Sequence, residues 1–87
     1  MQLEILTPEK KVFSGVVYGV QLPGVSGQFE LLENHAPIVS ALAPGRLKIL
    51  KDRHTALEFF QIQSGFVEML HNHTTVLVEG AEPARGE

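Results

Sequence analysis

Four histidines are the side chains of this sequence best suited to metal or acid–base chemistry. His71 and His73 are two residues apart, so both would project from one face of a strand, a spacing that could hold zinc or nickel. A third ligand is missing from this pattern, because His54 lies in a polar turn with nothing to hold it near the other two. We therefore interpret "HNHT", residues 71–74, as a solvated hairpin turn and expect no metal site.

His35 is the other candidate for chemistry, since it stands between Asn34 and the Ala36-Pro37 step. The residue before a proline is restricted to extended geometry, so the local backbone is constrained. A general acid or base needs a partner group, and the carboxylates nearest in sequence belong to Glu30 and Glu33. Three interpretations remain open: a loop histidine that fixes the backbone, a catalytic residue, and a contact with a partner subunit.

No other pattern in the sequence assembles an active site or a cofactor site. Ser14 and Ser64 have no catalytic triad around them. The glycine-rich "LPGVSG", residues 22–27, lacks the following helix and the lysine of a phosphate-binding loop, and is better explained by a turn that needs positive φ. We expect neither catalysis nor a cofactor. The alternatives are a small-ligand-binding β-sandwich and an enzyme that uses His35.

The composition indicates one globular domain that does not bind nucleic acid. With 87 residues, of which 44% are hydrophobic and 20% charged, the chain is long enough for one modest core. The net charge is −3 and the seven Lys and Arg are spread along the chain, which argues against binding to a phosphate backbone. Cysteine is absent, so disulfides and thiolate metal sites are excluded. The weakly polar residues 36–44 are too few for a membrane-spanning helix, and we expect no direct membrane insertion.

Alternation of apolar and polar residues with a period of two is the main structural pattern, and it is typical of half-buried strands. Its clearest runs are residues 16–22, 46–50, 59–63 and 75–79. In the first run, the shared face of a strand would hold Val16, Tyr18, Val20 and Leu22. In the third, Phe60 and Ile62 would face the core, which leaves Phe59 toward an edge or an interface.

Turn patterns separate these runs at short intervals. They are "TPEK" (7–10), "PGVSG" (23–27), "PGR" (44–46), "SG" (64–65) and "HNHT" (71–74). The first would close an N-terminal hairpin and the last a C-terminal one. No segment has a helical period over three turns. We therefore predict an all-β fold, a flattened β-sandwich or barrel over residues 1–81, followed by a polar tail, residues 82–87, that frays.

The segment "ENHAPIVSALAPG", residues 33–45, carries an apolar run between two Ala-Pro steps. It predicts either a buried crossover between two layers or a contact surface for another protein. Pro37 and Pro44 restrict the backbone before any binding event, so less entropy would be lost on association. The absence of charge from residues 36–45 suits the buried centre of an interface.

Several motifs occur together in a fixed order. They are "FSG", then "LPGVSGQFELLENHAPIVSALAPGRLKI", then "QIQSGFVEML" and "TVLVEGA". In this order, from about residue 3 to residue 81, they resemble the epsilon subunit of F-type ATP synthases. The most specific feature is His-Ala-Pro followed eight residues later by the Gly that opens a strand.

This resemblance implies about ten short, mostly antiparallel strands and a non-catalytic rotor subunit of the central stalk. The subunit would bridge gamma to the polar loops of the c-ring and couple proton or sodium flow to ATP synthesis. It would lie peripherally on the cytoplasmic face of a bacterial inner membrane. The segment 33–45 would then be a rigid docking surface covered by gamma.

The resemblance also assigns residues to each partner. The c-ring contact would comprise Ser26, Gln28, Phe29 and Glu30. Gln28 stands where family members commonly have an acidic residue. The gamma contact would comprise Thr7, His35 and Ser40.

The sequence departs from the family pattern at two places. Most epsilon subunits continue with a helical hairpin that inhibits ATP hydrolysis, whereas this sequence stops at Glu87. We expect a naturally short form without an inhibitory arm rather than a truncated one. Many relatives have Tyr-Pro-Gly where this chain has Leu32-Glu33-Asn34, so the loop before His35 would differ locally.

Overall fold

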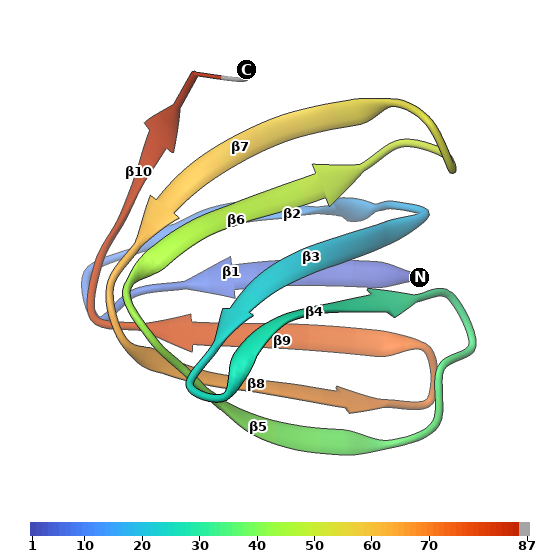
Figure 1. Cartoon of the computed structure of the whole chain (residues 1–87), viewed down its shortest axis with the longest axis horizontal. Coiled ribbons are helices and arrows are strands. Elements are labelled where there is room, and N and C mark those ends of the chain that lie inside the picture. The colour runs from blue at the N-terminus through green and yellow to red at the C-terminus, as the bar shows by residue number, and fades with distance from the viewer. Residues whose placement is uncertain (86–87) are drawn as a thin grey trace.

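The computed structural model describes residues 1–85, which form ten strands and no helix (Figure 1). The strands are β1 (Gln2–Leu6), β2 (Lys11–Val16), β3 (Gly19–Gly24), β4 (Gly27–Leu32), β5 (Ile38–Leu42), β6 (Gly45–Leu50), β7 (Ala56–Ile62), β8 (Gly65–Leu70), β9 (His73–Val78) and β10 (Ala81–Ala84). The predicted all-β fold is confirmed.

The strands form one strongly bent sheet in the order β10-β7-β6-β3-β5-β8-β9-β1-β2, with β4 paired to β3 beside this path. All pairs are antiparallel except β1 with β9. β3 and β5 meet at a single residue pair, Gly24 and Leu42. This corner divides the sheet into a layer of β10, β7, β6, β3 and β4 and a layer of β5, β8, β9, β1 and β2, as expected of a flattened sandwich.

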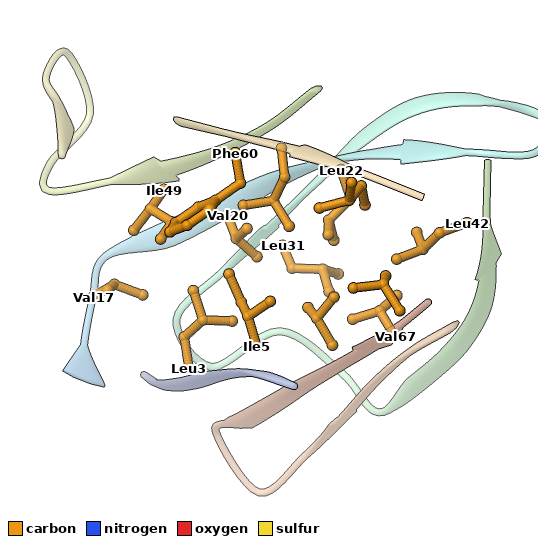
Figure 2. Packing of buried hydrophobic residues seen from close by; sticks show 14 of the residues in the cluster. Leu3, Ile5, Val17, Val20, Leu22, Leu31, Leu42, Ile49, Phe60 and Val67 are labelled. Carbon is orange, nitrogen blue, oxygen red and sulfur yellow. The ribbon is translucent and has the colours of Figure 1, made fainter. Parts of the chain in front are cut away.

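The core lies between the two layers and is made by the inward-facing residues of alternating strands. Leu22, Ile49 and Phe60 come from one layer, and Ile5 and Val67 from the other, and they meet at the centre (Figure 2). Each fully buried side chain of this size contributes roughly 1.5–3 kcal/mol of transfer free energy. The alternation in the sequence therefore marks the core correctly through most of the strands.

The Phe59–Phe60 pair divides between the faces as predicted. Phe60 is 3% exposed and Ile62 is fully buried. Phe59 faces outward and is half-buried, with the Arg46 guanidinium 5.4 Å from the centre of its ring. This cation–π contact covers part of the ring from solvent.

Both predicted terminal hairpins are present. The Thr7 amide donates to the Lys10 carbonyl at 2.9 Å, which closes the turn between β1 and β2. His71 and Asn72 join β8 to β9 with φ of 52° and 60°. Two successive positive φ angles are those of a type I′ turn, whose twist matches that of the flanking strands. The turn therefore occupies only two residues of the expected 71–74, and His73 already belongs to β9.

The expectation that Val16, Tyr18, Val20 and Leu22 share one strand face is wrong. The chain turns a corner between β2 and β3, where the Val17 amide donates to the Met1 carbonyl at 2.8 Å. Val16 ends β2 and is 81% exposed, whereas Val20 and Leu22 are buried in β3. The alternation of residues 16–22 does not reveal this corner, because a bend between two strands need not interrupt a period of two.

The expected boundary at residue 81 is also wrong. Residues Ala81–Ala84 form β10, in which Glu82 pairs with Gln61 of β7. Arg46 donates from Nη1 to the Arg85 carbonyl at 2.7 Å and fastens the end of this strand. Pro83 is tolerated because β10 is an edge strand. Residues 86–87 of the expected tail lie outside the described residues.

The turns gather at two ends of the sandwich (Figure 1). The Ser26 end holds residues 7–10, 25–26, 43–44, 63–64 and 79–80. The His35 end holds Met1 and residues 17–18, 33–37, 51–55 and 71–72. Three of the four histidines lie in turns of the His35 end, and the fourth, His73, begins β9 there. The two ends therefore differ in chemistry although the same strands connect them.

We predict that Gly65→Ala lowers the free energy of unfolding by about 3 kcal/mol. A Cβ at this position would collide with the backbone of Leu77 and Val78 on the neighbouring strand, which cannot move without breaking the ladder. Urea unfolding followed by circular dichroism measures the effect.

Gly80→Ala is the matched control at the same end of the molecule. Its Cβ would meet only Gln63 Cγ at 3.4 Å, an ordinary contact. We expect a change below about 0.5 kcal/mol. Equal stability of the two variants would contradict the close approach at Gly65.

Candidate partner-binding surfaces

The outward side of the layer that contains β8 and β9 carries an unusual number of apolar side chains. We call this set the outer apolar face; it comprises Leu6, Val39, Ala41, Phe66, Leu70 and Leu77. Ala41, Phe66 and Leu77 lie opposite one another on β5, β8 and β9, and Leu6 on β1 continues the row. Val39, Phe66 and Leu77 are 69%, 58% and 52% exposed. Exposed Glu68 separates Phe66 from Leu70 on β8, so the contiguous part of the face is the row of Leu6, Leu77, Phe66 and Ala41. Contiguous apolar side chains of this kind mark surfaces that bind another macromolecule.

A shallow groove of about 320 Å³ crosses the outer apolar face at the Ser26 end. Its lining includes Leu6, Thr7 and Pro8 from the first strand and turn, and Phe66 and Leu77 from β8 and β9. The groove is open to solvent along its length, whereas small-molecule sites enclose most of the ligand. Its shape therefore favours a protein surface over a small ligand.

The predicted gamma-contact residues are not brought into one cluster. Thr7 lies half-buried beside the groove, and its hydroxyl is 3.3 Å from the Lys10 carbonyl. His35 is exposed at the opposite end of the sandwich. Ser40 is half-buried on β5, paired with Val67 on the row that faces inward. Thr7 and His35 thus lie near the two ends of the outer apolar face.

The His35 ring is held by its own neighbour. The Nδ1–H group donates to the Ala36 carbonyl at 2.7 Å; because a carbonyl only accepts, Nδ1 carries the proton. The backbone amide donates to the Leu32 carbonyl at 3.1 Å. Within residues 1–85, no hydrogen bond or ion pair joins this ring to Glu30 or Glu33. The structure therefore does not assemble the acid–base pair that the catalytic interpretation requires.

The predicted c-ring residues lie on one hairpin, β3–β4, with different orientations. Ser26 is exposed at its tip, and Gln28 and Glu30 face outward on β4. The Gln28 Nε2 group donates to Gln21 Oε1 across the hairpin at 3.2 Å. Three of the four predicted residues therefore form one exposed polar strip.

Phe29 differs from the other three because its ring faces inward. It is half-buried and packs against the core cluster. A Cβ added to Gly24 would lie 2.8 Å from this ring, so the two strands are in close contact there. Phe29 therefore supports the hairpin from its inner side. Near the tip of the hairpin, Val25 is an exposed apolar residue, with 65% of its surface accessible, and the sequence patterns did not single it out.

A small charged cluster borders the outer apolar face. Glu4 on β1 accepts from Lys11 Nζ at 3.3 Å and lies 3.5 Å from His73 Nε2. The Lys11 ammonium, and to a smaller extent His73, hold the pKa of the Glu4 carboxyl below its usual value. His73 thus contacts a carboxylate. Across residues 1–85, no group of three or more His, Cys, Asp or Glu side chains is arranged to hold a metal ion.

The sequence and the fold fit one known family. Residues 1–84 match the family model of the ATP synthase, Delta/Epsilon chain, beta-sandwich domain. The chain belongs to this family. The resemblance inferred from the ordered motifs is thereby confirmed.

Two relatives of this family define how much of an epsilon chain is present. The ATP synthase epsilon chain of Protochlamydia amoebophila (strain UWE25) is 44% identical over 80 residues, which cover 92% of this chain and 54% of that protein. The ATP synthase epsilon chain of Chlorobium limicola is 39% identical over 79 residues, covering 90% of this chain and 88% of that protein. The chain thus spans about half the length of the first relative and most of the second.

A solved structure shares the fold. It is a chain in the OSCP/F1/c-ring assembly of the Euglena gracilis mitochondrial ATP synthase, with a TM-score of 0.84 and 19% identity. The match covers 93% of this chain and 51% of that chain. At this identity the likeness shows the β-sandwich fold alone. None of the described residues belongs to a helix long and apolar enough to cross a membrane.

We predict that Lys11→Met raises the pKa of Glu4 toward its ordinary value of 4.5, because the largest cause of the lowered pKa is removed. The folded-state pKa lies below the unfolded one. The contribution of Glu4 to stability is therefore complete above pH 4.5 and is lost as the pH falls through the folded-state pKa. NMR titration of the Glu4 carboxyl measures both values.

Lys10→Met, one residue earlier in the exposed turn, is the control and should leave the Glu4 titration unchanged. A wild-type Glu4 that titrates at or above 4.5 would show that this ion pair is absent in solution.

Proposed function

We propose that this chain is a non-catalytic subunit of the central stalk of an F-type ATP synthase, where it bridges gamma to the polar loops of the c-ring. In this role it would couple ion flow, of protons or sodium, to ATP synthesis. The observation that carries the proposal is the outer apolar face, which lies between Thr7 and His35, the residues that the family resemblance assigns to gamma.

Gamma is the occupant that best explains the chemistry of this face. The row of Leu6, Leu77, Phe66 and Ala41 is apolar, whereas the charged groups Glu4, Glu68 and His73 lie beside it toward the His35 end. Buried interface centres are depleted of charge and surrounded by polar rims. Covering these side chains would release free energy at about 25 cal/mol for each Å² of apolar surface removed from water.

The face is also stiff, which favours a part that turns with a rotor. β5 pairs with β8 at every residue from Ile38 to Leu42, between Pro37 and Pro44. A paired strand with a proline on each side has little freedom to lose on association. The segment 33–45 thus contributes a strand edge to the docking surface and is not a separate loop.

The β3–β4 hairpin suits the second partner. Ser26, Gln28 and Glu30 present hydroxyl, amide and carboxylate groups at and near the Ser26 end. Polar loops of a c-ring would find hydrogen-bond partners there, whereas the outer apolar face would not offer them. One end would therefore meet the c-ring while one side meets gamma. The subunit would lie peripherally on the cytoplasmic face of a bacterial inner membrane.

We predict that Leu77→Gln weakens binding to the cognate gamma subunit by about tenfold, or roughly 1.4 kcal/mol. The substitution places a polar group at the centre of the proposed interface. Calorimetry with purified gamma measures the affinity, and thermal unfolding checks that the fold is kept.

Leu57→Gln is the matched control, because Leu57 has a similar exposure, 47% against 52%, and lies on β7 in the other layer. Its affinity for gamma should equal that of the wild type. If both variants bind like the wild type, or both lose affinity equally, the outer apolar face is not the gamma site.

We predict that Ser26→Cys forms a disulfide with a cysteine placed in the polar loop of the c subunit in the assembled complex. The chain has no cysteine of its own, so the variant carries one thiol. Non-reducing gel electrophoresis after mild oxidation detects the product.

Ser14→Cys, an exposed position on β2 of the other layer, is the control and should give no product. Equal yields from both positions would contradict the assignment of the β3–β4 hairpin to the c-ring.

A further inference from the structure

The His35 segment, residues 33–37, leads directly into β5, and the side chain of Asn72 ties it to the β8–β9 turn as well. Asn72, in the β8–β9 turn, accepts from the Asn34 backbone amide through Oδ1 at 2.7 Å. The two residues are 38 positions apart in sequence. This bond therefore fixes one turn of the His35 end relative to another.

Both partners have a backbone that suits this bond. Asn34 has φ of 66° and Asn72 has φ of 60°, in the left-handed region that asparagine tolerates better than most residues. The Asn72 carbonyl also accepts from the Gln2 amide at 3.1 Å. The β8–β9 turn thus holds β1 with its backbone and the His35 segment with its side chain.

The other restraints on the segment come from different elements. The Glu33 amide donates to the Tyr18 carbonyl at 3.1 Å, and the His35 amide donates to Leu32 within the same turn. Neither bond reaches β8 or β9, which carry Phe66 and Leu77. On its C-terminal side the segment is held by the β5–β8 ladder, which begins at Ile38, and within residues 33–37 the Asn34–Asn72 bond is the described side-chain hydrogen bond to the β8–β9 turn.

We propose that Asn72 is a positioning residue for partner binding: its side chain holds residues 33–37 in the conformation that the partner recognises. This inference rests on the proposed docking of gamma at the outer apolar face. Asn72 is exposed, so water can replace part of its bond, and its loss should change global stability little. The loss should instead appear in binding, because a released segment must be ordered when the partner binds.

Asn72→Gly tests the proposal without disturbing the turn. Glycine accepts positive φ at no cost and is favoured at this position of a type I′ turn, so only the side chain is lost. We expect the Asn34 amide to exchange with solvent at least about tenfold faster by NMR, and affinity for purified gamma to fall about fivefold.

His71→Gly is the matched control, because His71 is the other turn residue and has φ of 52°. It should leave Asn34 exchange and gamma affinity at wild-type values. Asn72→Asp keeps an oxygen acceptor at the same position and should restore most of the Asn34 protection.

The outcomes separate this inference from the proposed function. Unchanged Asn34 exchange in Asn72→Gly, or the same losses in His71→Gly, would overturn the positioning role. Faster Asn34 exchange with undiminished gamma affinity would overturn its part in binding. If the wild-type chain does not bind gamma, the proposed function is wrong. In that case the rate of Asn34 amide exchange alone decides whether Asn72 holds residues 33–37.

Discussion

The meeting of β3, β4 and β5 at Gly24 is the constraint on which both proposed surfaces depend. Gly24 pairs with Leu42 and Gly27, and a Cβ there would lie 2.7 Å from the Gly27 carbonyl oxygen and 2.8 Å from the Phe29 ring. Only glycine lets β3 and β4 approach this closely at the point where β3 also pairs with β5. The corner directs the β3–β4 hairpin toward the Ser26 end and turns β5 into the other layer. A polar tip and an apolar face are thereby set on one rigid body.

The outer apolar face is assembled from strands that are distant in sequence. β1 lies parallel to β9, which places Leu6 beside Leu77. Phe66 on β8 lies next to Leu77, and Ala41 on β5 completes the row beside Phe66. No single strand carries the outer apolar face. The face therefore forms only after the N-terminal strand has paired with the C-terminal hairpin. Such non-local pairing is slow to form, and it makes the proposed binding surface a property of the completed fold.

Features that local patterns determine could be predicted from the sequence. Features that depend on pairing with a strand distant in sequence could not. Within residues 75–79, the alternation places Val76 and Val78 on the buried face and Leu77 on the exposed one, because a pleated strand sends neighbouring side chains to opposite sides. The corner at Val17 and the pairing of β10 depend on which strand lies alongside, and alternation does not encode this. The exposure of the Phe66 side chain could not be predicted from the sequence for the same reason. The turn pattern at 23–27 coincides with the tip of the β3–β4 hairpin, but neither this pattern nor the ordered motifs revealed that Phe29 turns inward.

The position of the outer apolar face within the sheet determines how a partner can bind. β8 and β9 are flanked by β5 and β1, so their backbone groups are already paired and cannot accept an added strand. The path of the sheet ends at β10, which carries Pro83 and is poorly suited to strand addition, and at β2, which pairs with β1 and does not adjoin β8 or β9. A partner at Phe66 and Leu77 must therefore bind through side-chain packing. Recognition would then depend on shape and on a fixed His35 segment, since packing against a rigid face tolerates little displacement of its borders.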